Sequence, residues 1–203
     1  EGPNTGGMGA YSPAPIITKQ LEKKIINKIV KPTLLALKVR RKPYKGFLYV
    51  GLMIKDNEPY LIEFNVRMGD PECQVILPRL KTDLVKIIQN IIKNKLSKIK
   101  IKWSQKKCMT IVLCSKGYPG KYKKDITLNN LDEILLKKND YIFHAGTKIE
   151  NNRILSNGGR VLNISSSGYD FKKIRDRIIH LIKKLNWKNG YYRKDIGWKI
   201  IKQ

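Results

Sequence analysis

The stretch YLIEFNVRMGDPE, residues 60–72, threads charged and amide side chains through an apolar run. Residues 62–67 alternate between apolar and polar, which is typical of a β-strand with one buried face. GFLYVGLMI, residues 46–54, predicts a buried strand before it, and DNEP between the two predicts a hairpin turn. We therefore expect a hairpin whose second strand packs Ile62, Phe64 and Val66 into a core.

The polar face of that strand carries Glu63, Asn65 and Arg67. Neighbours on one face of a strand lie about 6.6 Å apart, so Glu63 and Asn65 can reach one cation or two adjacent cations. A carboxylate and an amide oxygen suit Mg²⁺, with phosphate oxygens completing the shell, and an Arg fork suits phosphate or carboxylate. The alternative is a solvated hairpin face. The following GDPE, a turn that adds the acids Asp70 and Glu72, argues against that alternative.

Two glycine-rich segments are candidates for binding anions. In GPNTGGMGAYSP, residues 2–13, the glycines Gly6, Gly7 and Gly9 allow close backbone approach to a ligand and backbone angles closed to other residues. By composition this segment is a loop, and a plain flexible loop explains it equally well. In SNGGRVLNIS, residues 156–165, Arg160 either clamps a substrate phosphate or is an exposed side chain beside a hairpin turn.

The sequence contains neither a Ser/His/Asp or Cys/His catalytic set nor a His/Cys metal cluster. His144 ends an apolar strand, where a lone histidine is more often structural than catalytic. Cys108 and Cys114 lie too far apart on one extended strand for a disulfide. With Cys73 they show the cysteine usage of a reducing, cytoplasmic protein, and neither a signal peptide nor a membrane-spanning run is visible.

The remaining pattern predicts an α+β protein in two parts, divided between residues 99 and 100 by a polar connection. The first part has a helix starting at Thr18, a kink or second helix at Pro32, and a helix capped by Thr82 or Asp83. The second part is small and mostly antiparallel. Its predicted strands are CMTIVLCS, YIFHAGTKIE, RILS and GRVLNIS, and a helix over residues 170–185 turns Ile174, Ile178 and Leu181 inward.

The net charge of +26 raises the possibility of a nucleic-acid-binding protein. The lysines are spread along the whole chain, however, without an RNP-like aromatic motif, a zinc finger or a basic arm. General enrichment in Lys, Ile and Asn explains the charge better. A non-catalytic basic fragment that binds RNA stays an alternative, to be tested by the salt dependence of RNA binding.

Six stretches follow one another in a specific order: GPNTGGMGAYSP, IEFNVRMGDPECQVILPRL, SKGYPGKY, FHAGT, SNGGRVLNI and YYRKDIG. In this order they resemble the glycinamide ribonucleotide synthetases (phosphoribosylamine–glycine ligases), over essentially the whole chain. The resemblance implies an ATP-grasp ligase of purine biosynthesis. Such an enzyme joins glycine to phosphoribosylamine through a glycyl phosphate, and converts ATP to ADP and phosphate.

The resemblance also implies roles for individual residues. Glu63 and Asn65 would bind the Mg²⁺ or Mn²⁺ that bridges the ATP phosphates. Arg67 and Asp70 would be catalytic, Arg67 by stabilising phosphate or carboxylate oxygens and Asp70 by positioning an amine or a supporting residue. Arg160 would hold the ribose 5-phosphate. The other implied substrate-binding residues are Asn4, Thr5, Gly6, Gly7 and Glu72.

The chain departs from the resemblance at its start, which falls inside the ATP-grasp domain. Residues 1–99 correspond to the C-terminal part of that domain, and residues 100–203 to the small C-terminal domain. The half that holds adenine and the phosphate-gripping lysine is not in these 203 residues. We therefore expect an inactive isolated chain, with the N-terminal half as its partner. Another ATP-grasp carboxylate–amine ligase is the second alternative, but RMGDPE and YRKDIG favour the glycine ligase.

Overall fold

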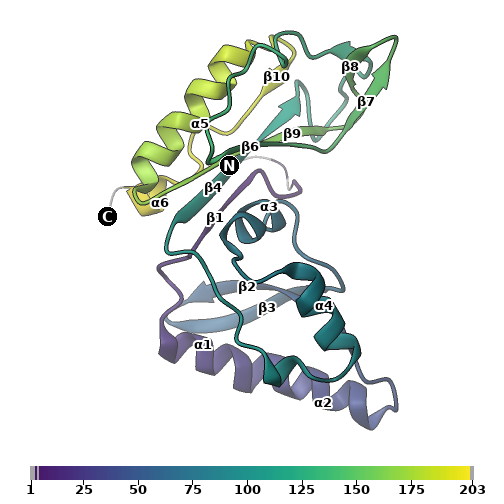
Figure 1. The fold of residues 1–203 in the computed structure, drawn as a ribbon, viewed down its shortest axis with the longest axis vertical. Coiled ribbons are helices and arrows are strands. Elements are labelled where there is room, and N and C mark those ends of the chain that lie inside the picture. Colours follow the sequence, from purple (N-terminus) through teal and green to yellow (C-terminus); the bar gives the residue numbers. More distant parts are fainter. Residues whose placement is uncertain (1–2, 4, 202–203) are drawn as a thin grey trace. The chain divides into compact units, whose positions relative to one another are not determined.

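A computed structural model describes residue 3 and residues 5–201 (Figure 1). The chain forms two compact units. The hairpin unit comprises Ala14–Gly69 and Leu80–Trp103, and the sheet unit comprises the described residues of Glu1–Pro13, Asp70–Arg79 and Ser104–Gln203. The predicted boundary after residue 99 follows this division only in part, because two earlier segments pack with the C-terminal one. As a boundary between family domains it stays a prediction.

The hairpin unit begins with a continuous helical run. Thr18 caps it as predicted, since its hydroxyl accepts a hydrogen bond from the Leu21 N–H at 3.1 Å, and Leu21 is fully buried. Pro32 is the second residue of the last helix of this run and directly follows a π-helical turn, where the regular α-helical hydrogen-bond pattern is interrupted. The run consists of α1 (Lys19–Ile25), the π-helix η1 (Ile26–Val30) and α2 (Lys31–Val39).

The predicted hairpin is present as β2 (Tyr49–Lys55) and β3 (Glu58–Asn65), joined at Asp56 and Asn57, whose φ angles are 51° and 58°. A β-bulge interrupts it, because Gly51 pairs with Glu63 and Leu52 with Leu61, which leaves Ile62 without a partner. The predicted core face is therefore wrong. Ile62 is 63% exposed, and Val66, beyond the strand, is 76% exposed. The first strand is also not buried as predicted, since only Gly51 in it is fully covered.

The rest of the hairpin unit contains one amphipathic helix, α4 (Leu84–Ile92). Asp83, the second of the two predicted caps, accepts a hydrogen bond from the Lys86 N–H at 2.8 Å. Ile87 is the buried residue of this helix. The 3₁₀ turn η3 (Leu96–Lys98) follows, and a single bridge between Leu80 and Trp103 closes the segment.

The sheet unit is built on an antiparallel sheet in the order β1-β4-β9-β6, with β10 paired to β4. Three of the predicted strands of the C-terminal part are present as single strands, but the predicted strand YIFHAGTKIE is divided into β6 and β7, which belong to different sheets. The N-terminal segment is not wholly a loop as predicted, because Gly9–Ser12 forms β1 against Cys108–Ile111. The strands are β1 (Gly9–Ser12), β4 (Lys107–Ser115), β6 (Asp140–His144), β9 (Arg160–Gly168) and β10 (Gly190–Tyr191), with a separate small sheet of β5 (Ile126–Thr127), β7 (Thr147–Glu150) and β8 (Arg153–Ser156).

The central strand β4 is covered on both faces, which explains its nearly continuous apolar sequence. On one face, Met109, Ile111 and Leu113 join the core formed with α5 (Phe171–Leu185), which lies along the sheet in Figure 1. Ile174, Ile178 and Leu181 of α5 are buried, as predicted. On the other face lie α3 (Cys73–Ile76) and the short η2 (Leu77–Arg79). The last helix of the described chain is the four-residue α6 (Trp198–Ile201).

One buried carboxylate joins β6 to α5. Asp140, whose side chain is 2% exposed, accepts hydrogen bonds on Oδ2 from Nε and Nη2 of Arg177, at 2.9 and 2.7 Å. Its Oδ1 accepts from the Ser166 hydroxyl at 2.7 Å, and Oδ2 also accepts from the Lys137 N–H at 3.0 Å. Burial acts to raise the pKa of Asp140, but these donors outweigh it, so the pKa is lowered.

The three cysteines are free, as predicted. Burial raises the pKa of Cys108 and of Cys114 to about 12. Both therefore stay thiols at neutral pH, which removes them as candidate nucleophiles.

Candidate active site

Glu63 and Asn65 share one face of β3. The bulge ends before them, and from Glu63 to Asn65 the pairing with Gly51, Val50 and Tyr49 is regular. Gly51 lies directly opposite Glu63. A Cβ atom at Gly51 would come within 2.9 Å of Cγ of Glu63, so the glycine leaves the space that the carboxylate side chain occupies.

The two side chains suit a divalent cation that takes most of its ligands from elsewhere. Glu63 is exposed and Asn65 half-buried, and both offer oxygen donors. Among the residues that the structure describes, no three His, Cys, Asp or Glu side chains gather into a metal site. A carboxylate and an amide with substrate or water oxygens therefore fit this strand better than a cage made wholly of protein ligands, which is how Mg²⁺ is usually held.

Arg67 follows Asn65 past the end of β3. Its Nη2 donates to Oδ1 of Asn65 at 3.3 Å, and its Nη1 donates to the Met68 carbonyl at 2.9 Å. The guanidinium is exposed and lies beside the amide oxygen of the predicted metal ligand. The sequence placed these two residues on one face, and the structure brings them into contact.

Asp70 and Arg160, 90 residues apart in sequence, form an ion pair within the sheet unit. Nη2 of Arg160 donates to Oδ2 of Asp70 at 2.7 Å, and Nη1 donates to the Asp70 carbonyl at 2.8 Å. The other carboxylate oxygen, Oδ1, accepts from Nε2 of Gln74 at 3.0 Å. The Arg160 side chain is 24% exposed, so the predicted alternative of a freely exposed arginine beside a turn is wrong.

The Gly-rich segment lies against this pair. Nη1 of Arg160 donates to the Gly7 carbonyl at 3.2 Å, and a Cβ atom at Gly7 would lie 2.3 Å from Cδ of Pro71. The expected close backbone approach is thus made to the protein's own residues. None of Gly6, Gly7 and Gly9 has a positive φ, so the expectation of angles closed to other residues is wrong.

The other predicted residues occupy different positions. Thr5 is described and half-buried, whereas Asn4 lies outside the described residues. Glu72 takes the N-cap position of α3 without a side-chain cap, and its carbonyl accepts from the N–H groups of Val75 and Ile76. His144 has a structural contact, with its Nδ1 at 3.0 Å from Oγ1 of Thr147.

Sequence reasoning missed Tyr118, which lies in the quoted stretch SKGYPGKY but received no role. Its hydroxyl accepts a hydrogen bond from the Gly6 N–H at 3.2 Å. An aromatic residue between Gly117 and Pro119 is a signal for a specific turn, but nothing local shows that the ring reaches a segment 112 residues earlier. Gln74, whose Nε2 donates to Oδ1 of Asp70 four residues earlier, was also missed.

Comparison with known families identifies the family of this chain. Residues 1–73 match the ATP-grasp (A) domain of phosphoribosylglycinamide synthetase, and residues 108–199 match the C domain of the same enzyme. The fold and the site thus define an ATP-grasp protein, as predicted. Membership of this class implies the use of ATP and a divalent metal. More particularly, the chain belongs to the phosphoribosylglycinamide synthetase family.

Individual relatives cover nearly the whole chain. A chloroplastic phosphoribosylamine–glycine ligase of Arabidopsis thaliana is 42% identical, over 100% of this chain and 39% of the relative. A phosphoribosylamine–glycine ligase of Caldanaerobacter subterraneus is 44% identical, over 97% of this chain and 46% of the relative. The chain therefore spans about half the length of most of the curated relatives it matches.

Solved structures show the same relationship. The crystal structure of phosphoribosylamine–glycine ligase from Thermotoga maritima matches with a TM-score of 0.80 and 32% identity, over 96% of this chain and 47% of that one. The biotin carboxylase domain of a Hydrogenobacter thermophilus 2-oxoglutarate carboxylase matches with a TM-score of 0.59 at 12% identity, which is a likeness of fold alone.

Proposed function

We propose that this chain supplies the metal-binding strand and the C-terminal domain of a phosphoribosylamine–glycine ligase. The observation that carries the proposal is the placement of Glu63 and Asn65 on one face of β3, within a chain that the family's two domain models match in order. In the proposed reaction, a glycine carboxylate oxygen attacks the γ-phosphorus of ATP and ADP leaves. The amine of phosphoribosylamine then attacks the carbonyl carbon of glycyl phosphate and displaces phosphate.

Each residue of the hairpin unit has a proposed part in the first step. Glu63 and Asn65 hold Mg²⁺ or Mn²⁺, which when bound neutralises charge between the two anions that must approach each other. Arg67 lies at the end of the same strand with its fork exposed, and it stabilises phosphate or carboxylate oxygens. Gly51, opposite Glu63, keeps the side of the strand open for the carboxylate.

The residues of the sheet unit have a proposed part in the second step. Asp70 is held by Arg160 and Gln74, and it positions an amine or a group that supports one. Thr5, Gly6 and Gly7, with Asn4 outside the described residues, lie along the substrate, and Glu72 is a further substrate-binding group of the same turn.

Arg160 keeps donors for the ribose phosphate. A guanidinium carries five N–H donors, and the contacts with Gly7 and Asp70 occupy three of them. Within the described part of the chain, Nε and one N–H of Nη2 then stay available. Two N–H groups on one planar fork are the usual means of binding a phosphate bidentately.

The proposed partner is the N-terminal half of the enzyme. The hairpin unit presents apolar side chains that a protein surface rarely exposes together, including the neighbours Tyr60, Leu61 and Ile62 at 56%, 45% and 63% exposure. Leu35 and Val39 on α2 are likewise exposed, at 61% and 74%. Exposed apolar side chains in this number support docking of a further protein segment on this unit.

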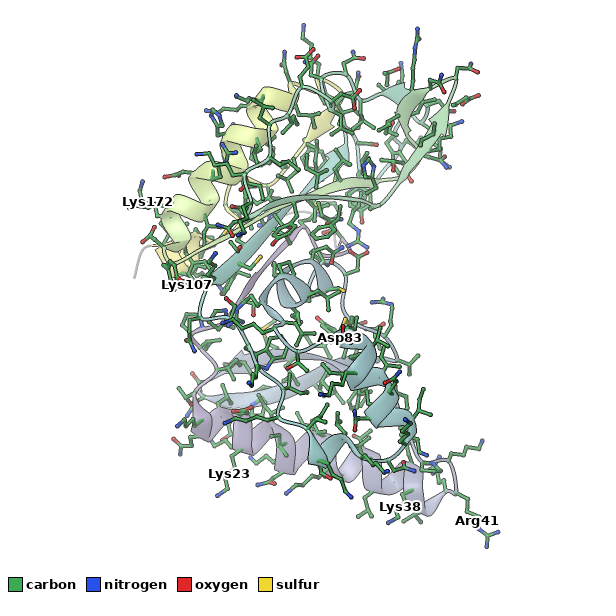
Figure 2. All side chains as sticks on the ribbon, viewed as in Figure 1. Lys23, Lys38, Arg41, Asp83, Lys107 and Lys172 are labelled. Carbon is green, nitrogen blue, oxygen red and sulfur yellow. The ribbon has the colours of Figure 1, made fainter. Side chains whose placement is uncertain are left out.

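The proposal includes a cytoplasmic location and no role in binding nucleic acid. The cytoplasmic location rests on three free cysteines, although one plant relative is named as chloroplastic. No helix in the described part of the chain has the length and apolar character to span a membrane. Figure 2 shows Lys23, Lys38 and Lys172 projecting from α1, α2 and α5, so the positive charge is dispersed over separate helices.

The experiment is a ligase assay with and without a supplied N-terminal half. The half is taken from the Thermotoga maritima relative, as the residues that precede the part matched here. We expect release of ADP and formation of glycinamide ribonucleotide only when both protein parts, glycine, phosphoribosylamine and ATP are present. Substantial turnover by the isolated chain would show that the division of labour is wrong, and ADP release independent of glycine would show that the substrate is wrong.

A further inference from the structure

The position of the Gly-rich segment is determined by side chains of the sheet unit that follow it by more than a hundred residues. The Gly6 N–H donates to Oη of Tyr118 at 3.2 Å, and the Gly7 carbonyl accepts from Nη1 of Arg160 at 3.2 Å. A Cβ atom at Gly6 would lie 3.3 Å from both Oη of Tyr118 and Cζ of Arg160. The segment therefore has one hydrogen bond to each of these two side chains, and a Cβ atom at Gly6 would crowd both.

Tyr118 is itself held in place from several directions. Its carbonyl accepts from the Tyr191 hydroxyl at 2.8 Å, and its N–H donates to the Ser115 carbonyl at 3.1 Å. Its ring lies so close to Gly159 that a Cβ atom there would be 2.2 Å from Cδ2. Gly117, just before it, has a φ of 101°, which a side chain rarely adopts, and a Cβ atom there would lie 2.2 Å from the Lys121 carbonyl oxygen.

These contacts give the phenol a single direction before any substrate arrives. A ring fixed by Gly159 and by a turn that requires glycine loses little freedom when its hydroxyl accepts a hydrogen bond. Pre-organisation of this kind lowers the cost of ordering a loop against a ligand. A hydroxyl that accepts from the loop backbone acts on the loop position, whereas a group aimed at a reacting atom would act on the chemical step.

We propose that Tyr118 is a positioning residue, whose hydroxyl fixes the backbone of Gly6 and so sets the Gly-rich segment where it meets the phosphorylated ribose substrate. The proposal rests on the proposed function for the identity of that substrate. The contact itself lies wholly within the sheet unit and does not depend on it.

The first test needs no activity. Amide hydrogen exchange at Gly6 is followed by NMR in the 203-residue chain and in its Tyr118→Phe variant, which keeps the ring against Gly159 and removes only the hydroxyl. A net hydrogen bond of ordinary strength predicts exchange about threefold to tenfold faster in the variant. Tyr122→Phe is the matched control, because the Tyr122 ring centroid lies 6.3 Å from that of Tyr118, whereas the Gly6 N–H donates to the Tyr118 hydroxyl. Unchanged exchange at Gly6 in the Tyr118 variant would overturn the proposal.

The second test uses the ligase assembled with the supplied N-terminal half. Tyr118→Phe should raise KM for phosphoribosylamine about threefold to tenfold, with KM for ATP and the Tm unchanged, which a general loss of structure would not do. Gly159→Ala keeps the hydroxyl but forces the ring to move, so it should raise KM for phosphoribosylamine in the same direction, while the clash with the ring also lowers the Tm. A fall in kcat alone, or an equal rise in all three KM values, would overturn the proposal. If the wild-type assembly makes no product, the proposed function fails and the exchange experiment alone decides the role of Tyr118.

Discussion

Replacing Arg177 by methionine leaves the buried carboxylate of Asp140 with two of its four hydrogen bonds. The Ser166 hydroxyl and the Lys137 N–H stay in place, and the two charged donors are lost. Breaking a fully buried ion pair costs about 3–5 kcal/mol. Because Arg177 is 23% exposed and neutral donors remain, we discount this cost to about 2 kcal/mol at neutral pH.

The stability difference between wild type and the Arg177 variant should depend on pH in one direction. The donors hold the pKa of Asp140 below its usual range, so the stability that it contributes is present above the unfolded pKa and is lost as the pH falls through the folded value. Without Arg177, the pKa of Asp140 rises, because burial is then opposed only by the two neutral donors. The difference in free energy of unfolding between wild type and variant should therefore shrink from about 2 kcal/mol near pH 7 to below about 1 kcal/mol near pH 3.

Urea unfolding of the chain across this pH range is the assay. Lys172→Met is the matched control, because Lys172 lies on the same helix and pairs with Asp176 at 3.0 Å, but both side chains are more than half exposed. An exposed pair of this kind should contribute less than about 0.5 kcal/mol. A loss in the Arg177 variant that is independent of pH, or no larger than that of the control, would refute the reasoning.

Two predictions concern the proposed ligase and are measured in the assembled enzyme. Glu63→Ala should raise the Mg²⁺ concentration needed for half-maximal rate more than Asn65→Ala does, because it removes a charged ligand. Glu22→Ala, which removes an exposed acid on α1, is the control. A wild-type dependence on Mg²⁺ in the Glu63 variant would show that this strand does not bind the metal. Arg160→Ala should raise KM for phosphoribosylamine about tenfold to a hundredfold, because a charged hydrogen bond is worth about 1.5–3 kcal/mol. The KM values for ATP and glycine should change little. Arg153→Ala, at the exposed start of a strand, is the control and should leave KM for phosphoribosylamine unchanged. An unchanged KM for phosphoribosylamine would return Arg160 to a purely structural role, and a rise for ATP alone would place β9 beside the nucleotide.

The sequence predicted those helices and strands in which buried residues recur at a regular spacing. The helix predicted over residues 170–185 from the spacing of Ile174, Ile178 and Leu181 is present as α5, and Asp170 is its N-cap. The face of β3 could not be predicted in the same way, because one unpaired residue, Ile62, shifts the alternation and depends on the partner strand. The strand β1 is short and flanked by glycine and proline, so only its pairing with β4 reveals it.

The residues of the candidate site also differ in whether the sequence alone could place them together. Glu63, Asn65 and Arg67 are neighbours in sequence, and their common face was visible as a pattern. Arg160 was visible as an arginine behind two glycines, but its partner Asp70 is 90 residues away and no local signal joins them. Contacts of that separation come from the topology of the sheet, which brings the start of β9 beside the N-terminal segment.

The pairing of β1 with β4 has a consequence for how this protein can be divided or inherited. The strand Gly9–Ser12 lies within the stretch that matches the A domain. It pairs along one edge of β4, the first strand of the C domain. A gene that encoded residues 100–203 alone would produce a sheet with the 108–111 edge open, ready to pair with any other chain. Recombination therefore cannot transfer the C-terminal domain alone without exposing a sheet edge, because its sheet is complete only together with the strand Gly9–Ser12.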